Sequence, residues 1–423
     1  MGGIGKSTMA QVVYNDERVK REFELKAWVC VSEEFDVVGV TKLILEAFSL
    51  GGHYTNDLNS LQAKLKEMFC GKKFLIVLDD VWNENYDEWC HLKRPFQYRA
   101  QGSRIIVTTR SQRVASIMQT VESYKLKYLS DEDCWNLFAK HAFGYKNSRT
   151  NPSIDRIGRE IVKKCKGLPL AAKTLGGLLR STSDLKEWKN ISRSDIWDLT
   201  EMESNILPAL LLSYHSLPSY LKQAMLCLLL NIPKSYKFEE EELILLLILL
   251  WMAENLLQNP VNGERIEDIG DKYFLELVSR SFFQQSQSAG QHFVMHDLIN
   301  DLAGFVSGKF CVRLEDGNSN INVDARMRYL SFPVADGPVK LEAMDKNNRL
   351  RTLLTLGITF HDHKLQDDAF SKLVCLRVLS FSFFSALEEL PESIGLLRHL
   401  RYLKVSGTRF ERFPNSICSL YNL

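Results

Sequence analysis

A glycine-rich segment at residues 2–8 narrows the range of possible folds, because it has the sequence GGIGKST and matches the second half of the pattern GxxxxGK[ST]. In such a loop, glycines let backbone N–H groups turn toward a phosphate, and the following helix adds partial positive charge. Lys6 would neutralise the β- and γ-phosphates, and the Ser7 hydroxyl would be a ligand of Mg²⁺. The predicted nucleotide contacts of this loop are Gly3, Ile4, Gly5, Lys6, Ser7 and Thr8.

The same segment has a plainer interpretation as a structural turn, because short glycine-rich turns are common. The first glycine of the pattern, and the strand expected before it, would lie before Met1. We therefore expect a truncated form of the motif, and other elements must decide between the two interpretations.

A second element is the apolar run from Phe74 to Leu78, which is followed by Asp79 and Asp80. A buried strand that ends in two carboxylates is typical of the strand that faces a phosphate loop. We predict that Asp79 holds Mg²⁺ through water and that Asp80, the candidate catalytic residue, orients or deprotonates an attacking water. The alternative is a strand followed by an Asp-rich turn.

A third element is the segment from Ser103 to Arg110, a strand that would place the Arg110 guanidinium beside a γ-phosphate. Taken alone, Arg110 is a surface arginine at a strand end. Three apolar runs, at Ala27–Val31, Phe74–Leu78 and Ile105–Thr109, alternate with segments of helical spacing. This alternation predicts an α/β domain with a parallel sheet.

The composition of the 423 residues excludes several other classes of protein. With 53 basic and 52 acidic side chains, the chain offers no field that favours nucleic acid. Nine cysteines without a CxxC pair argue against a zinc site or a disulfide framework. No basic and apolar leader opens the chain, and the apolar run Leu243–Met252 is far shorter than the ~20 residues that span a bilayer, so we expect a cytoplasmic protein without an integral membrane segment.

The sequence pattern changes twice in the remaining two thirds of the chain. Helical patterns follow Asp131, and short strands at Phe282–Phe283 and His292–Met295 favour a winged-helix arrangement after them. Spaced leucines then recur with a fixed period, as Leu379 and Leu403 do 24 residues apart. Such a period predicts a solenoid whose units bury their apolar edges against one another.

These motifs, taken in order, resemble those of the NB-ARC ATPases, and specifically of plant nucleotide-binding leucine-rich-repeat disease resistance proteins. The resemblance covers nearly the whole chain. It rests on the motifs GGIGKST, FELKAWVCVSEEFD (23–36), KFLIVLDDVW (73–82), GSRIIVTTR (102–110), GLPL (167–170) and MHD (295–297). Trp82 after the acidic pair is similar to the coiled-coil subclass, so the resemblance implies a partial chain without its N-terminal signalling domain and most of its repeats.

The resemblance implies four domains: a P-loop NTPase parallel sheet domain at 1–128, a helical domain at 129–204, a winged-helix domain at 205–312 and an α/β leucine-rich-repeat solenoid at 323–423. It also implies that Pro169 packs near the adenine and that His296 touches the β-phosphate of ADP. Without it, Pro169 is a turn residue and His296 an ordinary helix-start residue. His292 and His296 lack a third nearby ligand, so we do not expect them to bind a metal.

Two places depart from the family pattern. Residues 243–250 are LILL written twice, which implies a four-residue insertion that turns downstream side chains by roughly 40 degrees and shifts them by about 6 Å. The segment Leu228–Asn231 replaces a more polar sequence. We expect local repacking around both segments.

The leading hypothesis is an ADP/ATP-binding switch of an intracellular plant immune receptor that acts in defence, at most a slow ATPase. The repeats would bind a pathogen effector or a guarded host protein, and activation could involve self-oligomerisation. One alternative is a nucleotide-free interaction fragment from a truncated gene. Another is a catalytic ATPase with steady turnover, which the two carboxylates permit.

Overall fold

The computed structural model describes residues 2–31, 35–48, 57–144, 152–180, 182, 184–198, 207–231, 238–260, 263–286, 292–313, 326–332, 349–355, 370–382, 390–406 and 412–423. The contacts between residues divide the chain into two compact units, Met1–Lys173 and Thr174–Leu423. We call them unit 1 and unit 2.

Unit 1 contains a parallel sheet of three strands in the order β1-β2-β3. The strands are β1 (Leu25–Cys30), β2 (Phe74–Asp79) and β3 (Arg104–Val107). Every residue of the central strand β2 is buried, as the continuous apolar run predicts for a strand covered on both faces. The three predicted strands are confirmed, with ends that differ by at most two residues.

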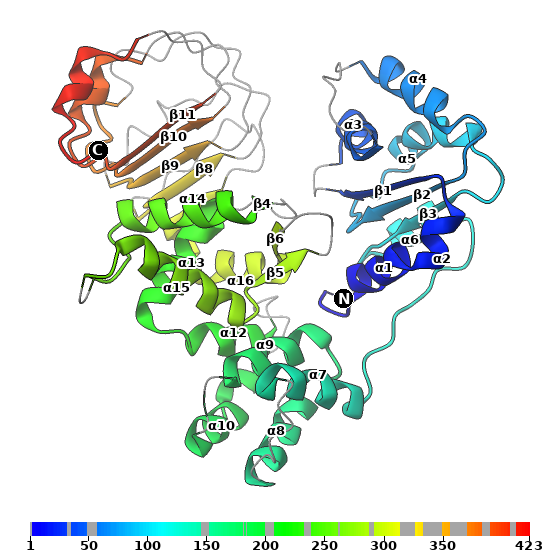
Figure 1. Cartoon of the computed structure of the whole chain (residues 1–423), viewed down its shortest axis with the longest axis horizontal. Coiled ribbons are helices and arrows are strands. Elements are labelled where there is room, and N and C mark those ends of the chain that lie inside the picture. Colours follow the sequence, from blue (N-terminus) through cyan, green and yellow to red (C-terminus); the bar gives the residue numbers. More distant parts are fainter. Residues whose placement is uncertain are drawn as a thin grey trace. The chain divides into compact units, whose positions relative to one another are not determined.

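Helices cover both faces of this sheet (Figure 1). Figure 1 shows α3, α4 and α5 on one face and α1 on the other. The helices of this part of the chain are α1 (Lys6–Asn15), α2 (Glu17–Glu22), α3 (Val37–Phe48), α4 (Leu58–Phe69), α5 (Tyr86–Lys93), the 3₁₀ helix η1 (Arg94–Tyr98) and α6 (Gln112–Met118). Side chains from α3, α4 and η1 meet those of β1 and β2 in one apolar core, in which Ile44, Leu65 and Phe74 are fully buried.

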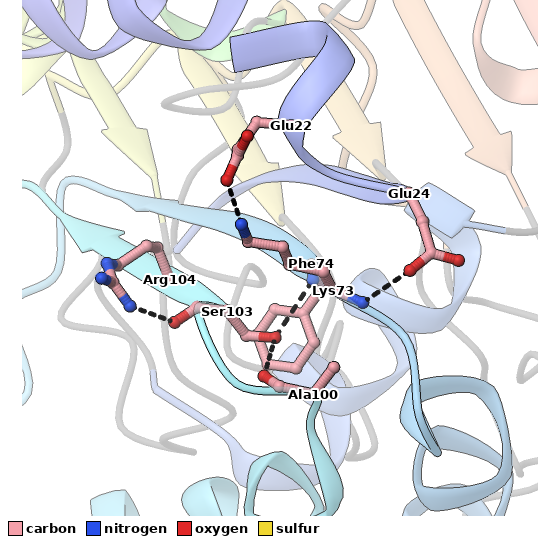
Figure 2. Close-up of polar contacts among 7 residues, drawn as sticks. All are labelled: Glu22, Glu24, Lys73, Phe74, Ala100, Ser103 and Arg104. Atoms are coloured by element: carbon pink, nitrogen blue, oxygen red, sulfur yellow. Dashed lines mark hydrogen bonds and ion pairs between the residues drawn. The ribbon is translucent and has the colours of Figure 1, made fainter.

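Hydrogen bonds stabilise the edge of the sheet at which β2 and β3 begin (Figure 2). The Phe74 N–H donates to Ser103 Oγ at 3.2 Å, and Ser103 Oγ donates to the Ala100 carbonyl at 2.9 Å. The Lys73 N–H donates to Glu24 at 3.1 Å, and the Lys73 ammonium pairs with Glu22. These contacts fix where β2 and β3 begin, and they therefore also fix which residues reach the carboxyl edge.

Helices follow the sheet and continue across the unit boundary. They are α7 (Asp131–Phe143), α8 (Pro152–Lys164), α9 (Pro169–Leu179), α10 (Leu185–Ser192), the 3₁₀ helix η2 (Asp195–Asp198), α12 (Pro208–His215) and α13 (Ser219–Asn231). Trp188 of α10 is 1% exposed. The side chains of Leu228–Asn231 lie outside the described residues.

A small antiparallel sheet in unit 2 has the order β4-β6-β5, with β4 at Phe238–Glu239, β5 at Phe283–Ser286 and β6 at His292–Met295. It lies among α14 (Glu240–Ala253), α15 (Ile266–Ser279) and α16 (Asp297–Ser307). The strand predicted at His292–Met295 is confirmed, and the one predicted at Phe282–Phe283 begins one residue later, at Phe283, whereas β4 was not predicted. The doubled LILL forms part of one continuous helix, α14, in which Leu243 and Leu247 are buried and Leu245 is 58% exposed.

The C-terminal part of unit 2 forms a parallel sheet of five strands in the order β11-β10-β9-β8-β7. The strands are β7 (Cys311–Arg313), β8 (Tyr329–Phe332), β9 (Thr352–Thr355), β10 (Val378–Ser382) and β11 (Tyr402–Ser406), accompanied by the 3₁₀ helices η3 (Gly308–Phe310), η5 (Glu392–Leu396) and η6 (Asn415–Ser419). Leu379 lies opposite Leu403, so the 24-residue sequence period equals the pairing register. β7 lies before residue 323, where the sequence places the start of the repeats.

Candidate nucleotide site at the carboxyl edge of the unit 1 sheet

The glycine-rich loop turns through left-handed backbone conformations before α1. Gly3 has φ 70° and Gly5 has φ 95°, values that favour glycine because a Cβ atom would strain them. Gly5 caps α1 without a side-chain hydrogen bond, so no side chain of the cap residue occupies the first N–H groups of the helix. The first N–H groups of α1 therefore lie next to a loop whose backbone turns depend on glycine.

The end of β2 brings Asp79 to this loop. Ser7 Oγ, from the first turn of α1, donates to Asp79 Oδ1 at 2.9 Å. Thr108 Oγ1, directly after β3, donates to the same oxygen at 2.5 Å. Three elements that are distant in sequence thus converge on one carboxylate that is 7% exposed. The structure thus brings Ser7 and Asp79 together, whereas their predicted binding of Mg²⁺ stays a prediction.

Burial raises the pKa of Asp79 above its usual range, and the nearby Asp80 carboxylate adds to this rise. Hydrogen bonds from Thr108 and Ser7 and the charge of Lys6 oppose it. A cation beside Asp79 would favour the ionised carboxylate, because opposite charge stabilises the charged form.

Asp80 follows with φ 57°, a left-handed conformation that is uncommon outside glycine. Its backbone N–H donates to Thr108 Oγ1 at 2.9 Å, and its Oδ2 lies 3.6 Å from the Arg110 guanidinium. Arg110 also lies over the Trp82 ring, 5.0 Å from the centroid. The two residues predicted to act on the γ-phosphate therefore contact each other, and both side chains are less than 20% exposed.

Thr108 joins both aspartates and was not among the residues that sequence reasoning selected. It donates to Asp79 and accepts from the Asp80 N–H with one hydroxyl. The available signal was a hydroxyl residue at the end of a strand that neighbours the acidic strand. The parallel pairing of Leu78 with Val107 places the residues that follow them side by side.

The GLPL segment reaches the loop through its backbone. The Leu170 N–H donates to the Gly3 carbonyl at 3.2 Å, so Pro169, the first residue of α9, lies one residue from a direct contact with the glycine-rich loop. Gly167 has φ 70°, and a Cβ there would lie 2.5 Å from the Leu129 carbonyl oxygen. This turn can be built only with glycine in its present form, and it sets the approach of Pro169 to the loop.

His296 belongs to unit 2 and is the N-cap of α16, where its side chain accepts a hydrogen bond from the Leu298 N–H at 3.1 Å. Its role at a nucleotide stays a prediction. The His292 side chain lies outside the described residues. Within the described ranges, no group of three or more His, Cys, Asp or Glu side chains could hold a metal. The same part of the chain contains no helix with the length and apolar character needed to cross a membrane.

A glycine-rich loop before a helix, together with a buried carboxylate at the end of the neighbouring parallel strand, defines a domain of the P-loop class. Residues 1–148 match the NB-ARC domain family, a nucleotide-binding domain, and residues 232–303 match the disease resistance protein winged helix domain. The chain therefore carries NB-ARC and winged-helix domains of disease resistance proteins, and its homologues are plant disease resistance proteins.

Among these relatives is the putative disease resistance RPP13-like protein 1 of Arabidopsis thaliana, which is 43% identical over 100% of this chain and 40% of its own length. The putative disease resistance protein RGA1 of Solanum bulbocastanum is 41% identical over 96% of this chain and 38% of its own length. The disease resistance protein RGA2 of the same species is 47% identical over 72% of this chain and 31% of its own length. The chain spans less than half of the length of each of these relatives.

Proposed function

We propose that this chain is the nucleotide-binding switch segment of an intracellular plant immune receptor, and that it binds ADP or ATP with Mg²⁺ at the carboxyl edge of the unit 1 sheet. The observation that supports this most is the convergence of Ser7, Asp79 and Thr108 beside the glycine-rich loop. A purely structural turn has no need for a buried carboxylate that two hydroxyl groups and Lys6 surround.

The residues at this edge fit a magnesium ion by their chemistry. The Ser7 hydroxyl and the Asp79 carboxylate supply oxygen atoms, which are the ligands that Mg²⁺ prefers. The ion, when bound, would neutralise phosphate charge. In this proposal the backbone N–H groups of Gly3, Ile4 and Gly5, with Thr8 in the first turn of α1, hold the phosphates, and Lys6 adds a cation to them.

Arg110 and Asp80 form the part of the site that distinguishes ATP from ADP in this proposal. Their ion pair leaves the guanidinium anchored over Trp82, where a γ-phosphate could compete with Asp80 for it. Release of Asp80 would free a carboxylate to orient water for slow hydrolysis. Pro169 near the adenine, and His296 at the β-phosphate of ADP, complete the assignment as the family resemblance implies it.

We further propose that the five-stranded sheet of unit 2 is the start of a leucine-rich-repeat solenoid that reads a pathogen effector or a guarded host protein. The basis is the equality of the sequence period with the strand register, together with an apolar core made from the repeated leucines. Such an array buries its apolar edges between successive repeats. Self-oligomerisation on activation and a cytoplasmic location belong to the same proposal.

The amount of adenine nucleotide that the purified chain retains distinguishes the proposed switch from the two alternative functions. Purified wild-type chain is denatured, and the supernatant is assayed for adenine nucleotide, with Lys6→Ala as the variant. Near-stoichiometric ADP in wild type and its loss in the variant would support the switch. Absence of nucleotide in both would favour a nucleotide-free interaction fragment, and steady turnover far above one per minute would favour a catalytic ATPase.

A further inference from the structure

Four arginines occupy equivalent positions in the unit 2 parallel sheet. Arg328, Arg351, Arg377 and Arg401 each directly precede a strand, from β8 to β11. Their backbones are linked in sequence along the sheet edge, because the N–H groups of Arg351, Arg377 and Arg401 donate to the carbonyl of the preceding arginine at 2.7 to 2.8 Å. We call these residues the arginine row. A repeat therefore places four guanidinium groups along one edge of the sheet.

The end of α14 lies against this row. The helix ends at Ala253, and Asn255 follows with φ 59°. The Leu256 N–H donates to the Trp251 carbonyl at 2.8 Å, a bond typical of a left-handed helix terminus. This ending presents Glu254 to the sheet. Thr352 Oγ1 donates to Glu254 Oε1 at 2.5 Å, and Arg377 donates to the Glu254 carbonyl at 3.0 Å. The helix end is thus held in a fixed position by two strands.

One carboxylate oxygen of Glu254 accepts no hydrogen bond from the described residues. Glu254 is 3% exposed, and its Oε2 is buried without a hydrogen bond to any described residue, 3.5 Å from the Arg377 guanidinium. A buried acceptor without a donor costs free energy, so this atom calls for a partner that the described part of the chain does not supply.

A pocket of about 340 Å³ opens at this place, which is within the size range of small-molecule sites. Glu254, Arg351 and Arg377 line it, together with Gln223, Asn255, Leu256 and Tyr329. The Arg351 guanidinium lies close enough for its charge to lower the pKa of Glu254, as do the charges of Arg377 and Arg401. The pocket therefore combines two guanidinium groups that act electrostatically on Glu254 and a carboxylate oxygen of Glu254 that accepts no hydrogen bond from the described residues.

We propose that this pocket binds a small phosphate-bearing anion that keeps a hydroxyl group, with its charged oxygens on Arg351 and Arg377 and its hydroxyl donating to Glu254 Oε2. Guanidinium groups bind phosphate oxygens in a bidentate manner, and such charge-assisted bonds are strong. Two arginines against one carboxylate leave a net positive charge in the pocket. Hydrogen phosphate retains a proton at neutral pH, whereas sulfate does not, so only the former can donate to Glu254.

Equilibrium dialysis with radiolabelled inorganic phosphate at low ionic strength tests the proposal. The protein is wild type loaded with ADP and Mg²⁺, and also Lys6→Ala, so that phosphate bound at the glycine-rich loop can be recognised. We expect saturable binding in both proteins and an approximately tenfold weaker affinity in Arg351→Gln. Arg398→Gln, which removes an exposed arginine from the same region, should bind as wild type does. Sulfate should compete much less well than phosphate, and glycerol phosphate should show whether a larger ligand is preferred.

A measurement on the wild-type chain covers the case in which Arg351→Gln fails to fold. Phosphate should slow the modification of Arg351 by phenylglyoxal, read by peptide mass spectrometry, and should leave the rate at Arg398 unchanged. The proposal is overturned if neither phosphate nor glycerol phosphate binds, or if binding is lost in Lys6→Ala but kept in Arg351→Gln. Equal competition by sulfate would remove the donor role of the ligand toward Glu254.

Discussion

At the scale of single residues, the candidate nucleotide site depends on two hydroxyl groups, those of Ser7 and Thr108, which position Asp79 and Asp80. Although binding of Mg²⁺ stays a prediction, the sequence was sufficient to select Ser7 and Asp79, whose side chains share a hydrogen bond. It was not sufficient for Thr108, whose importance appears only when β3 lies beside β2. Nor did it predict that Arg110 would pair with Asp80 and lie over Trp82, since these contacts depend on the left-handed turn at Asp80.

Thr108→Val should lower the affinity for Mg²⁺-ADP by about tenfold, because it removes one hydrogen bond to Asp79 and leaves the Asp80 N–H without its acceptor. Titration with a fluorescent ADP analogue measures the effect. Ser103→Ala is the matched control, since it removes a buried hydroxyl from the opposite edge of the sheet. Both variants should lose roughly 1 to 3 kcal/mol of stability, so equal nucleotide affinities in the two would contradict the role of Thr108.

Glu254 should make the folding stability of the chain depend on pH, and the direction of its pKa shift sets the sign of this dependence. Burial raises its pKa in the folded chain, although the bond from Thr352 and the charge of Arg377 oppose this. Its contribution to stability is therefore fully present below the unfolded pKa, about 4.3, and is lost as pH rises through the folded pKa. We expect the urea midpoint of wild type, relative to that of Glu254→Gln, to fall as pH rises above the unfolded pKa.

Glu392 provides the opposite control for this measurement. Hydrogen bonds from Ser416 lower its pKa, so its contribution to stability is present above the unfolded pKa and is lost as pH falls. The midpoint difference between wild type and Glu392→Gln should therefore rise with pH. A difference for Glu254→Gln that is flat or also rises would show that Glu254 is not the buried acid described above.

At the scale of elements, periodicity carried most of the information. The apolar runs predict β1, β2 and β3 to within two residues, because a strand buried on both faces is continuous in sequence. The spacing of Leu379 and Leu403 predicts their pairing, because successive turns of a solenoid convert a sequence period into strand register. The two-residue strand β4 has too few residues for a period, and β7 lacks the repeated leucines of β8 to β11, so neither could be recognised.

The doubled LILL in α14 gives a test at this scale. Leu247→Ala should destabilise unit 2 by roughly 2 to 5 kcal/mol, because Leu247 is fully buried and the truncation leaves a cavity. Leu245→Ala lies two residues away in the same helix, and its side chain is 58% exposed, so it should change stability by at most about 0.5 kcal/mol. Urea unfolding followed by circular dichroism distinguishes them, and similar losses for both would contradict the observed orientation of α14.

At the scale of the whole molecule, the chain divides into a unit that contains the P-loop sheet and a unit that contains the winged helix and the repeating sheet. Motif order predicted four successive domains, and their bounds stay a prediction. The pocket beside Glu254 could not be predicted, because it is formed where the end of α14 meets the edge of a sheet whose strands are distant in sequence. Each unit therefore carries its own candidate ligand site.

The most direct test of the central claim is the magnesium dependence of ADP binding, measured by titration calorimetry on the wild-type chain and on Asp79→Asn. We predict saturable binding by wild type that Mg²⁺ strengthens, and loss of at least about tenfold of that strengthening in Asp79→Asn. Asp57→Asn, which keeps the N-cap of α4, should behave as wild type. Absence of ADP binding by the folded wild-type chain, or full magnesium dependence in Asp79→Asn, would contradict the proposed site.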